Sequence, residues 1–104
     1  HSIVTEGCEI DGHVENSVLS PSVKVQTGAN VCYSVLMPGA VVESGATVEY
    51  AIIGENTVVS SNAHVGEPPD GTDAWGVATC GPNITIKSGA VVRAGAMIYT
   101  GEEG

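Results

Sequence analysis

The large aliphatic residues between Val14 and Val65 recur at a fixed interval of seventeen residues. A short fixed period is typical of a solenoid, and it outweighs local preferences for helix or strand. The interval aligns Val14 with Val31, Val48 and Val65; Val18 with Val35 and Ile52; Leu19 with Leu36 and Ile53; Val25 with Val42 and Val59; and Ala29 with Ala46 and Ala63.

Each period divides into runs of five, six and six residues, and each run opens with a bulky aliphatic. The fifth residue of a run is small or β-branched, as at Ala40, Ala46, Ile52, Thr57 and Ala63. This hexapeptide pattern predicts a parallel β-helix, in which three short strands per coil form a triangular prism and the opening aliphatics stack inside it. A sandwich of short alternating strands is the alternative, but it gives no reason for a repeat of seventeen.

The pattern is incomplete at the start of the chain and is interrupted once. Residues 1–13 predict a partial first coil in which either Cys8 or Ile10 opens a run. Residues 66–79 include two adjacent prolines and several acids, which predicts a loop excursion from the prism. Trp75, near the end of this excursion, is expected to act as a hydrophobic lid on the prism.

The hexapeptides resume at Cys80 and end near Ile98, and residues 101–104 are expected to form a frayed polar tail. The sequence therefore predicts one all-β domain over residues 1–104, a β-helix of about five to six coils. No initiator Met, signal peptide or transmembrane stretch is evident, so we expect His1 to mark a cut inside a longer chain.

Charge and cysteine content narrow the possible partners. Twelve acidic residues face three basic ones, and a net charge of −9 argues against binding to nucleic acid or to anionic membranes. The three cysteines cannot all pair, and they show no CxxC or other metal-ligand spacing. We therefore expect reduced thiols, a cytoplasmic protein and no metal site.

The histidines are the residues most suggestive of chemistry. His13, Asn30, Thr47 and His64 share one column and predict an outward polar ladder. His13 and His64 would lie roughly 14 Å apart, too far to share a metal. His64, beside the excursion, is the best candidate for an acyltransferase base, but no cation for a coenzyme phosphate is evident nearby. The residues themselves predict a scaffold and no catalytic site.

Residues Gly7–Leu19 read GCEIDGHVENSVL and are followed from Ser34 by SVLMPGAVVESGATVEYAIIGENTVV. These segments resemble the C-terminal domain of glucose-1-phosphate adenylyltransferase (ADP-glucose pyrophosphorylase), where a GC-x-I-x-G-x-V-x-NSVL segment leads into coils spaced as here. The match covers residues 2–65 well, is looser over 66–79, and is only hexapeptide-like over 80–98. The resemblance implies a left-handed β-helix.

The resemblance also implies a parent enzyme of glycogen biosynthesis that uses ATP with Mg²⁺ and glucose 1-phosphate to form ADP-glucose and diphosphate. Its catalytic nucleotidyltransferase domain would precede this chain, which would hold no cofactor and no catalytic residue. In the family this domain serves oligomerisation, here expected to be a homo-oligomer, and allosteric control by small anions. Lys24, Lys87 and Arg93 are the candidate effector-binding cations. A hexapeptide acyltransferase using His64 and a non-catalytic regulatory paralogue are the alternatives.

Overall fold

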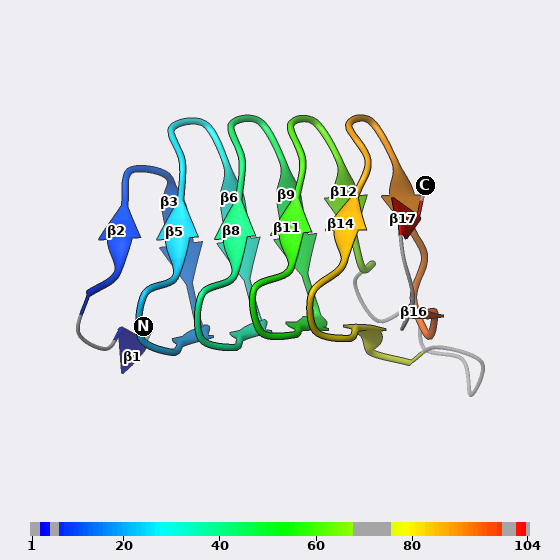
Figure 1. Ribbon diagram of the computed structural model, residues 1–104, viewed down its shortest axis with the longest axis horizontal. Coiled ribbons are helices and arrows are strands. Elements are labelled where there is room, and N and C mark those ends of the chain that lie inside the picture. The colour runs from blue at the N-terminus through cyan, green and yellow to red at the C-terminus, as the bar shows by residue number, and fades with distance from the viewer. Residues whose placement is uncertain (1–2, 5–6, 68–75, 99–101, 104) are drawn as a thin grey trace.

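The computed structural model describes residues 3–4, 7–67, 76–98 and 102–103. Within these residues the chain forms short parallel strands joined by tight corners, with no helix. The strands wind into a left-handed β-solenoid of about 5 turns, which confirms the predicted hexapeptide β-helix (Figure 1).

Three parallel sheets form the sides of the prism, and they are called faces A, B and C below. Face A contains β1 (Ile3–Val4), β4 (Val18–Leu19), β7 (Val35–Leu36), β10 (Ala51–Ile53), β13 (Ala78–Cys80) and β16 (Met97–Ile98). Face B contains β2 (Glu9–Ile10), β5 (Lys24–Val25), β8 (Val41–Val42), β11 (Val58–Val59), β14 (Thr85–Ile86) and β17 (Glu102–Glu103). Face C contains β3 (His13–Glu15), β6 (Asn30–Cys32), β9 (Thr47–Glu49), β12 (His64–Val65) and β15 (Val91–Val92).

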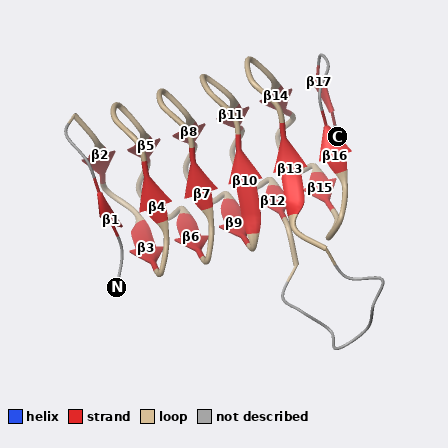
Figure 2. Cartoon of the chain, turned by 90° about the horizontal axis from the view of Figure 1, so that it is seen from below, coloured by secondary structure: helices blue, strands red, loops and turns tan. Residues whose placement is uncertain are grey.

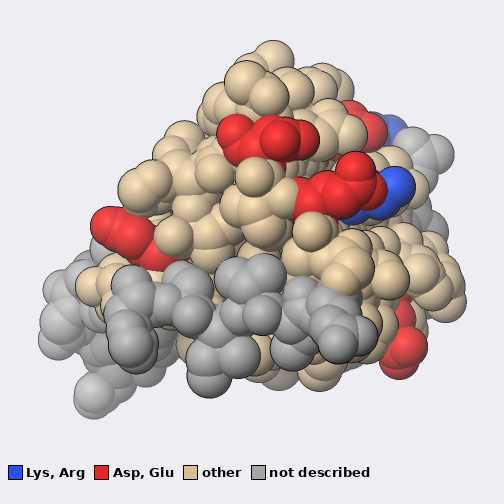
Figure 3. Space-filling view, turned by 90° about the vertical axis from the view of Figure 1, so that its left-hand side faces the viewer, with Lys and Arg blue, Asp and Glu red and all other residues tan. Residues whose placement is uncertain are grey.

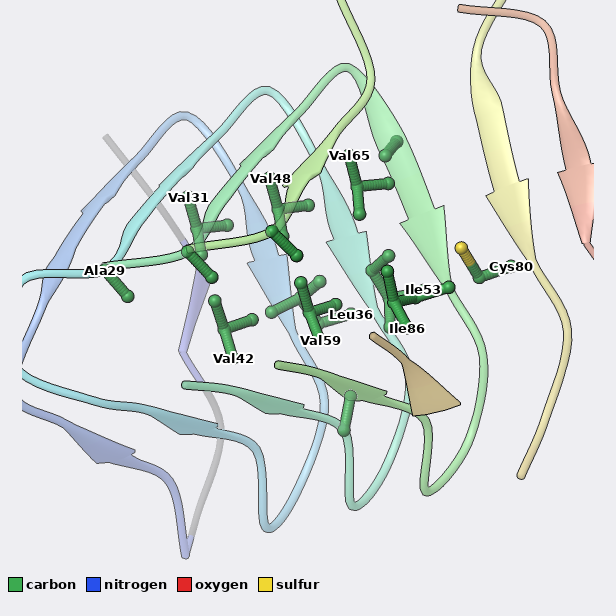
Figure 4. Close-up of a cluster of buried hydrophobic side chains, with 14 of the residues drawn as sticks. Ala29, Val31, Leu36, Val42, Val48, Ile53, Val59, Val65, Cys80 and Ile86 are labelled. Carbon is green, nitrogen blue, oxygen red and sulfur yellow. The ribbon is translucent and has the colours of Figure 1, made fainter. Parts of the chain in front are cut away.

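The core consists of inward columns that run along the prism. Val25 pairs with Val42 and Val42 with Val59 in neighbouring parallel strands, and all three are fully buried. Figure 4 shows the opening aliphatics of successive coils stacked in the interior. Burying a valine or isoleucine side chain fully contributes about 1.5–3 kcal/mol, so these columns hold the coils together.

The five-residue runs differ from the six-residue runs, whose fifth residues Ala40, Ala46, Thr57 and Ala63 are buried. Their small inward residue stands at the fourth place and not at the fifth, because a shorter run turns the corner from face C to face A with a single left-handed residue, such as Tyr33 (φ 49°) or Tyr50 (φ 50°). Ile52, the fifth residue of its run, therefore lies half-exposed on the outside of face A. The buried corner residues are Ser17, Ser34, Ala51 and Ala78.

The first coil is shorter than the others. Ile10 pairs with Val25, so Ile10 and not Cys8 occupies the column that opens the runs. The chain then passes tightly over the next corner at Gly12, where a Cβ atom would lie 2.6 Å from the carbonyl oxygens of both Gln26 and Ala29. Only glycine fits this shortened path, because real Cβ atoms do not approach backbone so closely.

The number of residues from one coil to the next increases after β12. Val35 pairs with Ile52, seventeen positions on, whereas Ile52 pairs with Thr79, twenty-seven positions on. Ten additional residues (27 − 17) are therefore accommodated between β12 and β13. Trp75, the expected lid, lies outside the described residues.

The last described strand corrects the expectation of a frayed tail. Glu102–Glu103 forms β17 and pairs in parallel with Thr85 and Ile86 of β14, so the chain continues the coil where a frayed tail was expected. Backbone pairing alone suffices for this, because a parallel neighbour supplies hydrogen bonds whatever the side chain.

Candidate functional site

The predicted polar ladder lies on the outside of face C. His13 pairs with Asn30, Asn30 with Thr47, and Thr47 with His64, each in the outward position of its strand. A second outward column runs beside it through Glu15, Cys32 and Glu49. The ladder prediction is confirmed, and the neighbouring column brings carboxylates next to the histidines.

His64 forms the closest of these contacts. Its Nε2 lies 3.1 Å from Oε1 of Glu49, and the two side chains are 42% and 18% exposed. When Nε2 donates to Glu49, the neutral ring presents Nδ1 as its acceptor. Glu49 was not predicted from the sequence, although its place two residues after Thr47 on one strand puts both side chains on the outer side.

Glu67 lies where the regular coil gives way to the ten-residue insertion. Its Oε1 accepts a hydrogen bond from the backbone N–H of Ala94 at 3.0 Å, and its Oε2 accepts one from Nη1 of Arg93 at 3.2 Å. The Ala94 hydrogen bond lowers the pKa of Glu67, and Arg93 and the nearby His64 lower it further against the opposing effect of desolvation. Glu49, His64, Glu67 and Arg93 together are called the face C cluster.

The same corner also holds the other end of the insertion. The backbone N–H of Gly95 donates to the carbonyl oxygen of Gly76 at 2.7 Å, and Ala96 N–H donates to Arg93 O at 3.1 Å to close the turn. Both described ends of the insertion, Glu67 and Gly76, therefore rest on the corner that follows β15.

The three predicted effector cations do not converge. Lys24 lies on β5 of face B, where its Nζ is 3.5 Å from Oε2 of Glu9. Basic and acidic atoms are seen side by side in the end view of the molecule (Figure 3). Lys87 follows β14 on the same face, three strands further along the sheet, and is exposed. Arg93 follows β15 on face C, so the structure brings Arg93 together with His64 and Glu67 and with neither lysine.

The cysteines are all free thiols in different surroundings. Burial raises the pKa of the Cys80 thiol to about 11. The half-buried Cys32 also has a raised pKa, first because of desolvation and then because Glu49 and Glu15 flank it. Among the described residues, no group of three or more His, Cys, Asp or Glu side chains could hold a metal ion. No helix in the described part of the chain is long and apolar enough to cross a membrane.

Three parallel sheets that form the sides of a prism, with inward aliphatics at hexapeptide spacing, define a hexapeptide-repeat β-helix protein. The chain belongs to the GlmU-like, C-terminal hexapeptide family, whose model matches residues 1–86. Hexapeptide domains of this type belong to a nucleotidyltransferase and acyltransferase family. No curated protein matches the chain.

Proposed function

We propose that this chain is the regulatory and oligomerisation domain of a cytoplasmic glucose-1-phosphate adenylyltransferase, with the catalytic domain preceding it in a longer protein. The GlmU-like family match and the resemblance of residues 7–19 to that enzyme support the parent activity. In this proposal ATP, Mg²⁺ and glucose 1-phosphate bind the preceding domain, and the β-helix contributes contacts between subunits.

The apolar outer surface of face A is the observation that supports a role in oligomerisation. Its strands lie side by side in Figure 2, and none of them contains a charged residue, whereas strands of faces B and C carry Glu9, Lys24, Glu15 and Glu49. Exposed apolar patches of this kind mark protein interaction sites. Five large hydrophobic residues are exposed on face A or its adjoining corners: Val18, Tyr33, Met37, Val77 and Met97.

A second copy of the chain is the partner proposed for this face. Two copies that each carry a net charge of −9 repel one another, and the repulsion is smallest where the facing surfaces lack carboxylates. Face A meets that condition along its strands, so contact through it buries apolar side chains without burying unpaired charges.

Sedimentation equilibrium with two matched variants tests this proposal. Val35 and Val41 are both half-buried, and each is the outward first residue of a two-residue strand, on face A and face B respectively. We expect the wild-type chain and Val41→Glu to associate and Val35→Glu to be monomeric, with all three equally folded by circular dichroism. An oligomer that survives Val35→Glu, or a wild-type monomer at every concentration, would contradict the proposed role of face A.

Effector control is the second part of the proposal. Anionic metabolites require cations, and Arg93, Lys87 and Lys24 are the ones this chain offers. Because these three lie apart, the preceding domain would supply most of the charge. The catalytic assignment is tested separately, by assaying ADP-glucose formation with this chain alone and with the longer protein. Only the longer protein is expected to be active.

An acyltransferase is the alternative, and the contact between His64 and Glu49 favours it. A carboxylate at 3.1 Å from Nε2 orients the ring as a general base requires. Isothermal titration with coenzyme A discriminates the two functions, because an acyltransferase must bind coenzyme A. An acyltransferase that uses His64 as its base should also lose acyl transfer in His64→Ala. Absence of any heat of binding would exclude it.

A further inference from the structure

We infer that the corner at Arg93 and Ala94 is an oxyanion-binding site that Glu67 occupies in cis, so that a free phosphate group competes with Glu67 for the same two donors. This inference rests on the proposed role of Arg93 in effector binding, and it adds the competitor and the second donor.

The donors are arranged as an anion requires. One is a guanidinium, Arg93 Nη1, and the other is a backbone amide, Ala94 N–H, and the two reach different oxygens of a single carboxylate, at 3.2 and 3.0 Å. A phosphate presents oxygens with the same acceptor character, and guanidinium groups bind carboxylate and phosphate alike. A ligand with two acidic oxygens can therefore replace Glu67 without rearrangement of the donors.

The contact is accessible and weak enough to exchange. The side chains of Arg93 and Glu67 are 75% and 39% exposed. Exposed ion pairs of this kind are readily screened and hold their partners only modestly. His64, which acts electrostatically on Glu67, adds positive charge to the same surface when it is protonated. Glu49 offsets part of that charge through its own contact with His64.

Exchange at this corner would alter how the insertion is attached. Glu67 precedes the undescribed residues 68–75 and Gly76 follows them, and both are held by the turn at Arg93 to Ala96. A phosphate bound to Arg93 and Ala94 replaces the Glu67 carboxylate on these two donors and leaves the Gly95 to Gly76 hydrogen bond in place. The binding of a small anion is thereby coupled to the contacts that Glu67 makes with this corner.

The test follows the amide signal of Ala94 by nuclear magnetic resonance during titration with inorganic phosphate and, separately, with glucose 1-phosphate. Glu67→Gln and Glu67→Ala weaken or remove the competitor. Glu43→Gln is the matched control, because Glu43 Oε1 also accepts a backbone N–H, from Ser61 at 3.2 Å.

We expect a saturable Ala94 shift whose dissociation constant is about two- to five-fold lower in both Glu67 variants than in wild type, as loss of an exposed ion pair allows. Glu43→Gln should match wild type, and Arg93→Gln should abolish the shift. The ligand that binds more tightly identifies free phosphate or a sugar phosphate as the source. An Ala94 signal that does not move in the Glu67 variants, or equal affinity with and without Glu67, overturns the inference. The sedimentation result for Val35→Glu is unaffected by either outcome.

Discussion

The ring of Tyr33 stacks on the ring of Tyr50, with centroids 4.9 Å apart and planes inclined by 7°. The separation matches the roughly 4.8 Å spacing of neighbouring strands, so side chains one period apart lie directly over one another. Both residues turn the corner between faces C and A, at the margin of the surface proposed for subunit contacts.

This stacking predicts a measurable coupling between the two rings. In a double-mutant cycle of Tyr33→Ala and Tyr50→Ala, the free energies of unfolding should show an interaction of about 0.5–1 kcal/mol, in the lower range for aromatic pairs. Urea unfolding of the four proteins provides the measurement. Strictly additive effects would show that the contact does not stabilise the fold.

The lowered pKa of Glu67 predicts that the stability of the fold depends on pH in a defined way. Its folded-state pKa is lowered, chiefly by the hydrogen bond from Ala94, so its contribution is complete above the unfolded pKa of about 4.3. That contribution is lost as the pH falls through the lower folded-state value. The melting temperature of wild type should therefore exceed that of Glu67→Gln at neutral pH, and the difference should disappear in acid. A difference independent of pH would contradict the assignment.

Cys80 is predicted to be inert towards thiol reagents in the folded chain. It is buried in the inward column of face A, and burial raises its pKa to about 11, so almost no thiolate is present at neutral pH. Labelling with a disulfide reagent near pH 8, read by peptide mass, should modify the partly exposed Cys8 and, more slowly because its pKa is also raised, Cys32. Cys80 should be spared until the chain is unfolded. Rapid labelling of Cys80 in the native state would contradict its buried position.

The period of seventeen was sufficient to predict the inward columns, the three-sided coil and the outward ladder through His64. It could not place the corners of the five-residue runs, because an inward Ala51 and an inward Ile52 fit the alternation equally well. The outcome was decided by the left-handed backbone at Tyr50, a conformation that the pattern of aliphatic residues does not reveal. The apolar outer surface of face A follows from that one-residue difference.

The face C cluster was predicted only in part. His64 and Arg93 were singled out separately, from a column and from a resemblance, but their proximity depends on the register across the ten-residue insertion. That register is set by strand pairing and cannot be counted from the sequence. Glu67 was visible only as one of several acids in an aperiodic stretch, and its role depends on the amide of Ala94 beneath it.

The most direct measurement compares the thermal unfolding of Val42→Asp and Thr47→Asp. Val42 is fully buried between Val25 and Val59, whereas Thr47 stands on the outer ladder of face C. An unpaired buried carboxylate costs about 3–5 kcal/mol, so Val42→Asp should lower the melting temperature by about 12 °C or more, or prevent folding. Thr47→Asp should stay within about 4 °C of wild type. Equal melting temperatures for the two variants would contradict an inward column repeated every seventeen residues.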